Sequence, residues 1–298
     1  MGALDGKAIA ITGSGRGIGR AVALAAAAEG AAVVVNDYGV SMDGNEPTSE
    51  VADSVVEEIK AAGGRAVANA NSVTTMEGGA SIVQSAVDTF GRIDGVVCVA
   101  GILRERMLFN MSEDEWDPVI ETHLKGTFTV FRAAAPIFRQ QKSGTMIGFT
   151  SGAFAASVAQ ANYAAAKGGI VSLVRSAAAG MTKYGVTANC IAPVAKSRMS
   201  GQVPFGIEMG EPEDVAPMVC FLLSDLAREV TGQIYTVNAG RIAVWNQPVE
   251  VREMRKDGRW GVEEIASRFS EVGQEPMPIL ERLKAMEAAA KAKDTPNA

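Results

Sequence analysis

The sequence is poor in the residues that build metal and disulfide sites, with one His and three Cys among 298 residues. A single His leaves no means of assembling a Cys/His metal cluster, so we expect no metal. The cysteines, Cys98, Cys190 and Cys220, are odd in number, widely spaced and set in apolar surroundings. This usage is typical of buried thiols in a reducing compartment and argues against a disulfide framework.

Basic charge and long hydrophobic runs are lacking as well. A net charge of −6 argues against the dominant basic face that nucleic acid or an anionic membrane requires. No apolar stretch reaches the roughly 18 residues of a membrane-spanning helix. Residues 1–7 lack the pattern of an export signal, and Gly6 stands where myristoylation needs Ser or Thr. We therefore expect a soluble cytoplasmic protein that binds neither nucleic acid nor membrane.

The sequence is rich in apolar residues, at 47%, and in glycine, at 32 residues, which is enough for one large core. Short apolar runs alternate with helix-favouring segments. The predicted strands are 8–12, 32–36, 65–69, 95–99, 145–149, 187–192 and 234–237. The predicted helices lie at 21–28, 51–62, 80–90, 161–184 and 212–223. One further helix is predicted to begin at the capping box of Ser112 and Glu115. Repeated βα units predict a doubly wound α/β fold, with a parallel sheet covered by helices on both faces.

Nothing before residue 240 resembles a linker, so we expect one dinucleotide-binding domain over 1–240 and a C-terminal extension over 241–298. Val262, Ile265 and Phe269 fall at helical spacing in that extension. Two interpretations stay open: its helices dock on the main body or on a neighbouring subunit, or they form a lid over the substrate site.

A cofactor site is predicted at the glycine-rich turn between the first strand and the first helix. Gly13, Gly17 and Gly19 let backbone N–H groups and the positive helix end approach a pyrophosphate, although an ordinary tight turn looks the same in sequence. Asp37 ends the second strand, where a carboxylate accepts hydrogen bonds from ribose hydroxyls and repels a 2′-phosphate. This favours NAD over NADP, and Arg16 in the turn acts against that preference.

The catalytic group is predicted on one helix and one strand end. Tyr163 and Lys167 are four residues apart and project from the same helix face. A neighbouring ammonium lowers the pKa of a phenol, which would suit Tyr163 to general acid/base work. Ser151 follows a strand at the carboxyl edge of the sheet, where its hydroxyl can hydrogen-bond a substrate oxygen.

Together these motifs resemble the classical short-chain dehydrogenases/reductases. The turn over 12–19 matches the family's Thr-Gly-x-x-x-Gly-x-Gly motif, and Ser151, Tyr163 and Lys167 match its catalytic positions. The resemblance implies a seven-stranded Rossmann-like sheet, hydride transfer at a nicotinamide, and homodimers or homotetramers. It also implies further cofactor contacts at Ser14, Ile18, Ser72, Val73, Ala100, Gly101, Pro193 and Ser197.

Within the family, the chain is similar to the (R)-3-hydroxyacyl-CoA dehydrogenase region of the multifunctional enzymes of type 2, a region that also acts on 17β-hydroxysteroids. The similarity lies at 35–37, 91–94, 100–104, 160–163 and 197–199. It implies an apolar acyl-CoA or steroid substrate. An apolar pocket for such a substrate is expected from Phe154, Met199, Phe205 and Met209.

Two departures from the family pattern bear on the catalytic group. Ser151 precedes Tyr163 by twelve residues, one fewer than is common, so Thr150 is the alternative to Ser151. His123 stands where the family usually has an Asn that supports a proton-relay water, and we expect it to serve the relay or the local structure. The alternative functions are an NAD-binding sensor or scaffold and a dehydrogenase of another secondary alcohol.

Overall fold

The computed structural model describes residues 2–39, 48–196 and 209–293. Its first compact unit, Met1–Trp245, contains an eight-stranded sheet in the order β3-β2-β1-β4-β5-β6-β7-β8. The strands are β1 (Ala8–Thr12), β2 (Ala32–Asn36), β3 (Arg65–Asn69), β4 (Gly95–Cys98), β5 (Gly144–Phe149), β6 (Val186–Pro193), β7 (Ile234–Asn238) and β8 (Arg241–Val244). The first seven pair in parallel, as in the doubly wound folds that the βα alternation predicts.

The expected strand count of seven was wrong, because β8 adds an antiparallel strand beside β7. Residues 241–244 follow β7 after a two-residue turn and pair back along it from Asn238 to Tyr235. The Trp245 indole N–H donates to Thr236 Oγ1 at 2.8 Å and its ring lies 4.6 Å from that of Phe154, which fastens the strand end. β8 is only four residues long and exposed on its outer side, so its sequence shows no core pattern.

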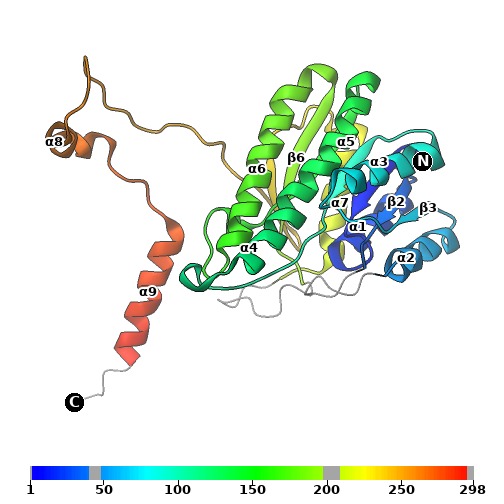
Figure 1. Ribbon diagram of the computed structural model, residues 1–298, viewed down its shortest axis with the longest axis horizontal. Helices are drawn as coiled ribbons and strands as arrows, with labels where there is room; N and C mark the ends of the chain where they lie inside the picture. Colours follow the sequence, from blue (N-terminus) through cyan, green and yellow to red (C-terminus); the bar gives the residue numbers. More distant parts are fainter. Residues whose placement is uncertain (1, 40–47, 197–208, 294–298) are drawn as a thin grey trace. The chain divides into compact units, whose positions relative to one another are not determined.

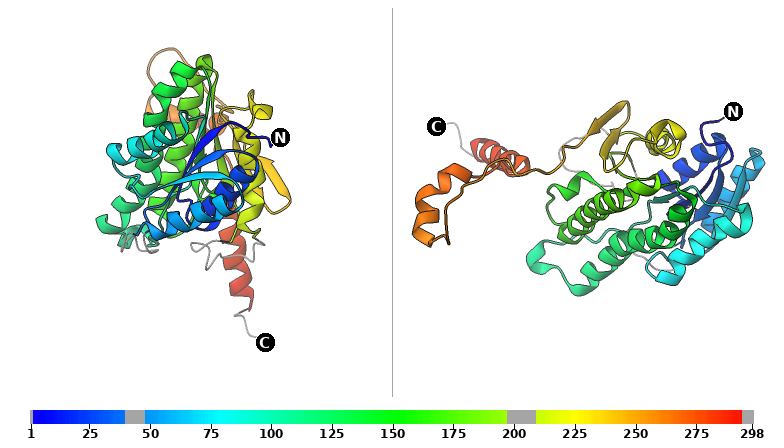
Figure 2. Two further views of the ribbon diagram at one scale, coloured as in Figure 1. Left: turned by 90° about the vertical axis from the view of Figure 1, so that its right-hand side faces the viewer. Right: turned by 90° about the horizontal axis from the view of Figure 1, so that it is seen from above.

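Helices cover both faces of this sheet (Figures 1 and 2). They are α1 (Gly17–Ala28), α2 (Glu50–Ala61), α3 (Met76–Phe90), α4 (Glu113–Ile120), α5 (Gly126–Gln141), α6 (Ala161–Met181) and α7 (Ala216–Leu223). Short helical turns are η1 (Leu108–Asn110), η2 (Glu121–Lys125), η3 (Gly152–Phe154), η4 (Thr182–Tyr184), η6 (Pro212–Val215) and η7 (Asp225–Ala227). η2 is a π-helical turn between α4 and α5, so the helix capped at Ser112 is interrupted where the sequence gives no break.

The alternation of side chains along the buried strands divides the core in two. Ile9 and Ile11 of β1 pack with α1, α2 and α7, whereas Ala10 faces the cluster formed with α3, α5 and α6. A strand buried on both faces reads as a continuous apolar run, which is why β1 and β2 could be predicted to the residue.

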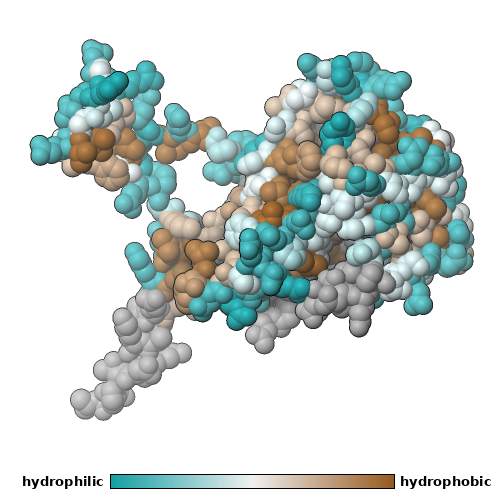
Figure 3. All heavy atoms as spheres, in the orientation of Figure 1, coloured by the Kyte–Doolittle hydropathy of each residue, from teal (hydrophilic) through white to brown (hydrophobic). Residues whose placement is uncertain are grey.

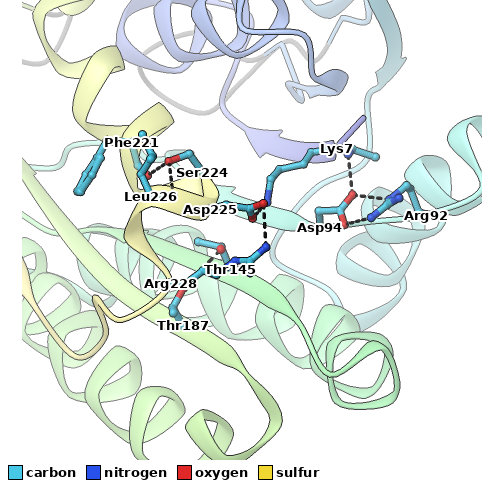
Figure 4. A network of polar contacts seen from close by, with 11 residues as sticks. Lys7, Arg92, Asp94, Thr145, Thr187, Phe221, Ser224, Asp225, Leu226 and Arg228 are labelled. Atoms are coloured by element: carbon cyan, nitrogen blue, oxygen red, sulfur yellow. Dashed lines mark hydrogen bonds and ion pairs between the residues drawn. The ribbon is translucent and has the colours of Figure 1, made fainter. Parts of the chain in front are cut away.

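The amino-terminal edge of the sheet is held by polar contacts (Figure 4). The Asp94 carboxylate accepts hydrogen bonds from the Ala8 N–H at 2.8 Å and from two nitrogens of Arg92. Nearby, Lys7 pairs with Asp225 at 2.9 Å, tying the start of β1 to the turn after α7. These contacts stabilise the amino-terminal edge of the sheet. The candidate site lies at the opposite edge, where the parallel strands have their carboxyl ends.

The second unit, Asn246–Ala298, contains α8 (Val262–Val272) and α9 (Pro278–Lys293). α8 coincides with the helix that the spacing of Val262, Ile265 and Phe269 predicted. Within this unit, Arg252 donates to the Val272 carbonyl at the end of α8, and Trp260 lies between Lys256 and Arg268. Over the described residues, every helix is too short or too polar to cross a membrane.

Candidate active site

The glycine turn between β1 and α1 is shaped by steric requirements at individual positions. A Cβ on Gly13 (φ +63°) would lie 2.7 Å from the Ala100 Cα, and one on Gly19 would lie 2.1 Å from the Gly13 carbonyl oxygen. Gly17 has φ +51° and open space around it, so its requirement is conformational. These three glycines form a cradle of bare backbone at the amino end of α1, which fits a dinucleotide pyrophosphate.

The remaining residues of the turn, Ser14, Arg16 and Ile18, differ in burial and in what they contact. Ser14 is fully buried; its hydroxyl donates to the Ile11 carbonyl at 2.7 Å and its N–H to the Asn36 carbonyl at 3.0 Å. Both of its donors are taken, so Ser14 fixes the turn. Arg16 is the exposed N-cap of α1, without a side-chain capping bond, and Ile18 packs against the core. Because no side chain caps the helix, the first backbone N–H groups of α1 remain available to bind an anion in the site.

Asp37 joins the turn to the loop after β2. Its Oδ2 accepts from the Gly15 N–H at 2.9 Å and its Oδ1 from the Gly39 N–H at 2.8 Å. A Cβ on Gly15 would lie 2.3 Å from Val51 Cγ1 and 2.8 Å from Asp37 Oδ2, so this glycine, absent from our predicted set, is required for the carboxylate to approach. The carboxylate stands directly after the end of β2, at the carboxyl edge of the sheet.

The expected contacts on the adenosine side are only partly open to a ligand. Ser72 is half-buried, with its hydroxyl 3.0 Å from that of Thr74. Val73 is buried in the core beneath Gly126 and its carbonyl accepts from Thr129. Val73 therefore offers little side-chain surface to a ligand.

Thr12 organises the next wall of the site. Its hydroxyl accepts from the N–H groups of Val99 and Ala100, at 3.1 and 3.2 Å, which ties the end of β1 to the chain leaving β4. This places Ala100 beside Gly13, across the switch point where the strand order reverses between β1 and β4. The first residue of the glycine motif thus has a role that spacing alone did not reveal.

Ser151, Tyr163 and Lys167 converge at the carboxyl edge. The Ser151 hydroxyl lies near enough to the Tyr163 phenol to lower its pKa, and Lys167 Nζ lies 5.3 Å from the centroid of the Tyr163 ring. The Lys167 ammonium donates to the Phe149 carbonyl at 2.6 Å. Thr150 is turned away, its hydroxyl donating to the Lys167 carbonyl at 2.9 Å. Of the two candidates, the geometry thus favours Ser151 as the partner of Tyr163.

In this catalytic group, the pKa of Tyr163 shifts in the direction opposite to the expected one. Burial raises the pKa of Tyr163 above its ordinary value, and the nearby Ser151 hydroxyl lowers it by less. Burial also lowers the pKa of Lys167 to about 7. The pKa of Tyr163 is therefore raised where we expected Lys167 to lower it, because desolvation dominates at both groups.

His123 lies on the π-helical turn η2, with its ring edge-on to Tyr163 at 5.2 Å and 85°. Its Nε2 is 2.8 Å from the Ile102 carbonyl oxygen, and among the described residues Nδ1 has no partner. Burial, followed by the charge of Lys167, holds the pKa of His123 well below its ordinary range, so the ring is neutral. A Cβ on Gly101 would lie 2.1 Å from the His123 ring, so Gly101 makes room for the imidazole.

Asn162 supports the same group, and our sequence-based reasoning missed it. Its buried side chain donates to the Glu115 carbonyl at 2.6 Å and the Arg104 carbonyl at 3.0 Å, and accepts from the Tyr163 N–H at 2.7 Å. The first turn of α6 is thereby fixed to α4 and to the loop after β4. A polar residue directly before Tyr163 was the only signal in the sequence.

On the side where the nicotinamide is expected, Pro193 ends β6 and the Val194 N–H donates to the Val237 carbonyl at 2.8 Å. Phe154, expected in the substrate pocket, packs against Trp245. Met209 is half-buried. Ser197, Met199 and Phe205 lie outside the described residues.

Comparison with known proteins agrees with this arrangement. Residues 13–241 match a family model of short-chain dehydrogenases/reductases described as enoyl-(acyl carrier protein) reductase. A hydroxyacyl-CoA dehydrogenase of Mycobacterium tuberculosis is 37% identical over 294 residues, which cover 92% of this chain and 91% of that protein. Mouse peroxisomal multifunctional enzyme type 2 is 44% identical over 242 residues, 80% of this chain but only 32% of that enzyme.

A solved structure extends the agreement to three dimensions. The crystal structure of a short-chain dehydrogenase from Mycobacterium avium has a TM-score of 0.84 and 44% identity, covering 92% of this chain and 98% of that one. The family is thus supported both by sequence over most of the chain and by fold, and it favours an enzyme over a cofactor-binding scaffold. The chain belongs to the short-chain dehydrogenase/reductase family of oxidoreductases.

Proposed function

We propose that the protein is an NAD-dependent dehydrogenase that interconverts a secondary alcohol and a ketone. The observation that carries this proposal is the convergence of Ser151, Tyr163 and Lys167 at the sheet edge that also bears the glycine cradle. A bare-backbone cradle and a buried phenol beside a hydroxyl supply the two functions that alcohol oxidation needs, cofactor binding and proton transfer.

Each residue has a distinct task in this mechanism. A nicotinamide dinucleotide supplies the hydride acceptor when it is bound. Tyr163 removes the hydroxyl proton of the substrate in the oxidative direction and returns it in the reductive one. Ser151 hydrogen-bonds the reacting oxygen. Lys167 lies over the Tyr163 ring and would hold the nicotinamide ribose, and His123 and Asn162 keep the ring of Tyr163 and its backbone in place.

NAD is the proposed cofactor because the Asp37 carboxylate occupies the end of β2. A 2′-phosphate there would meet the repulsion of a fixed negative charge, which Arg16, exposed at the N-cap of α1, offsets only in part. Dissociation constants for NADH and NADPH test this by direct titration. We expect NADH to bind at least tenfold more tightly, and tighter NADPH binding would overturn the assignment.

For the substrate we propose an apolar acyl-CoA carrying an (R)-3-hydroxyl group, or a hydroxysteroid. This rests on the hydroxyacyl-CoA dehydrogenase and multifunctional enzymes among the relatives. The test measures NADH formation with (R)- and (S)-3-hydroxyacyl-CoA and with 17β-hydroxysteroids. Stereoselective activity with the (R)-thioester supports the first substrate, and activity with neither class would redirect the proposal to other secondary alcohols.

Three further expectations belong to the same proposal. We propose a dehydrogenase domain over 1–240 with an extension over 241–298, assembly as a homodimer or homotetramer, and a cytoplasmic location. The location is supported by the free, buried state of Cys98, Cys190 and Cys220. Sedimentation equilibrium of the full chain distinguishes the two assemblies from a monomer.

A further inference from the structure

A buried amide ends the apolar run of β2. Hydrophilic side chains are spread over the surface of the molecule (Figure 3), whereas Asn36, the last residue of this strand, is 1% exposed. A buried polar group destabilises a fold unless hydrogen bonds replace those that it made to water. An apolar residue would continue the run of three valines without that penalty. The presence of Asn36 therefore has to be explained by what its side chain contacts.

The Asn36 side chain reaches across to the end of the neighbouring strand β3. Asn36 and Asn69 are register partners and form the last pair of the β2–β3 ladder. The Asn36 Nδ2 group donates to the backbone carbonyl and the side-chain oxygen of Asn69, both at 3.1 Å, and to the Asn71 carbonyl at 2.9 Å. Since an amide nitrogen carries two protons, these acceptors take up its full capacity to donate.

Asn69 is itself fixed by further contacts. Its Nδ2 group donates to the hydroxyls of Ser81 and Ser85 on α3, at 3.2 and 3.0 Å. Its Oδ1 accepts from the Asn71 N–H at 3.0 Å, which shapes the turn that follows β3. A buried polar network whose members are hydrogen-bonded makes its surroundings rigid. The pair of Asn36 and Asn69 therefore anchors the ends of both strands to α3.

Three segments on the expected adenosine side of the cofactor meet at this pair. The Asn36 carbonyl accepts from the Ser14 N–H at 3.0 Å, which holds the glycine turn. The Asn69 carbonyl accepts from the Asp37 N–H at 3.1 Å, which holds the backbone of the carboxylate. The side-chain bonds described above hold the chain that leads into Ser72. The two amides therefore set the spacing between all three segments.

We propose that Asn36 is a positioning residue for the adenosine half of the cofactor and that it acts through Asn69. The pair holds the glycine turn, Asp37 and the chain before Ser72 at the separation that the pyrophosphate and the ribose require. A site that is ordered in advance binds more tightly, because the ligand does not have to order it. This inference rests on the proposed NAD site and adds the interior residues that support its adenosine side.

The test is direct binding to the full chain, measured well below its melting temperature. NADH is titrated by its fluorescence, and ADP, which carries only the adenosine and pyrophosphate groups, is titrated by calorimetry. In Asn36→Ala, which removes the shared donor, we expect both affinities to fall by about tenfold or more and by similar factors. A loss for NADH without a loss for ADP would overturn the proposal, because the effect would then lie outside the adenosine side.

The matched control is Asn189→Ala, which removes another buried amide of the sheet. Asn189 lies in β6, across the switch point from β2, where its Nδ2 donates to the Val230 carbonyl at 2.7 Å and its Oδ1 accepts from the Gln233 N–H at 3.0 Å. Both variants should lower the melting temperature, but the control should leave the affinities for NADH and ADP nearly unchanged. Equal losses of affinity in the two variants would show a purely structural role and overturn the proposal.

A milder variant is used if Asn36→Ala does not fold. Ser81→Ala/Ser85→Ala removes only the two hydroxyls that accept from Asn69. We expect a smaller loss of affinity for both ligands, and in that case unchanged affinities would overturn the proposal. A wild-type preference for NADPH, or a lack of alcohol oxidation, would overturn the proposed function instead. The comparison of variants then proceeds with NADPH in place of NADH, so the two failures are distinguishable.

Discussion

At the scale of single residues, the candidate site is centred on the phenol of Tyr163, which is surrounded by three other side chains. Tyr163 contacts the ring of His123, lies beneath the ammonium of Lys167 and lies near the Ser151 hydroxyl. Substituting Tyr163→Phe keeps the ring contacts and removes only the acid/base oxygen. We expect turnover to fall by about 10² or more with NADH affinity unchanged. Steady-state rates and a cofactor titration measure both, with Tyr235→Phe as the control; near-normal turnover would contradict the assignment.

Replacing His123 should affect turnover less than replacing Tyr163. The imidazole contacts the Tyr163 ring and the chain after β4 and touches no charged group directly. In His123→Ala we expect turnover to fall by more than cofactor affinity, since the Tyr163 ring loses a packing partner and Ile102 loses its side-chain hydrogen bond. His123→Asn, which restores the usual family residue, should recover part of the rate. Unchanged turnover in the Ala variant would refute a role for His123, and near-ultraviolet circular dichroism checks that the variant is folded.

The residues that sequence reasoning identified are those whose chemistry is carried by type and spacing. Tyr163 and Lys167 are four apart on a helix, and the glycines are distinguished by their lack of a side chain. Thr12, Gly15 and Asn162 were missed because their roles depend on which chain passes nearby, and no local pattern records that. The direction of the Tyr163 pKa shift was missed for a related reason, since burial depends on the whole fold.

At the scale of secondary-structure elements, the seven parallel strands were predictable and the eighth was not. Residues 65–69 and 234–238 are flanked by turns and alternate with helices. Residues 241–244 instead form a short, mostly exposed edge strand, which is recognised only from its pairing with β7. The π-helical turn at Glu121–Lys125 was equally hidden, because helical periodicity runs on through it.

The contribution of β8 can be measured by truncation. A chain ending at Trp245 keeps the ladder to β7, the Trp245 to Thr236 hydrogen bond and the contact with Phe154; a chain ending at Gly240 loses all three. We expect the longer fragment to unfold cooperatively and the shorter one to have a melting temperature lower by about 5 °C or more. Differential scanning calorimetry of both fragments decides this, and equal melting temperatures would place the structural boundary nearer 240.

At the scale of the whole molecule, the buried Lys167 couples global stability to pH. Its pKa is about 7 in the folded protein against an ordinary 10.5, so between these values the unfolded chain binds more protons than the folded one. Stability from this group therefore rises with pH over that window, by up to about 1.4 kcal/mol per pH unit, and its penalty is full below pH 7.

Lys167→Met removes this dependence. We expect the variant to exceed the wild type in unfolding free energy most clearly near pH 6, and the difference to narrow between pH 7 and 9. Urea unfolding at several pH values gives the comparison, and it needs no activity from the variant. A difference that stays constant across this range would show that Lys167 titrates normally in the folded protein.

The two hydrogen bonds of Asp37 have a practical consequence for redesign. Each carboxylate oxygen already accepts a backbone N–H, one from Gly15 in the glycine turn and one from Gly39 beyond β2. Exchanging Asp37 for a small neutral residue, which under the proposed NAD preference would admit NADP, would therefore also release two loops from each other. An engineer who wants the phosphorylated cofactor must first give those amides a new acceptor, or accept a looser binding cleft along with the altered preference.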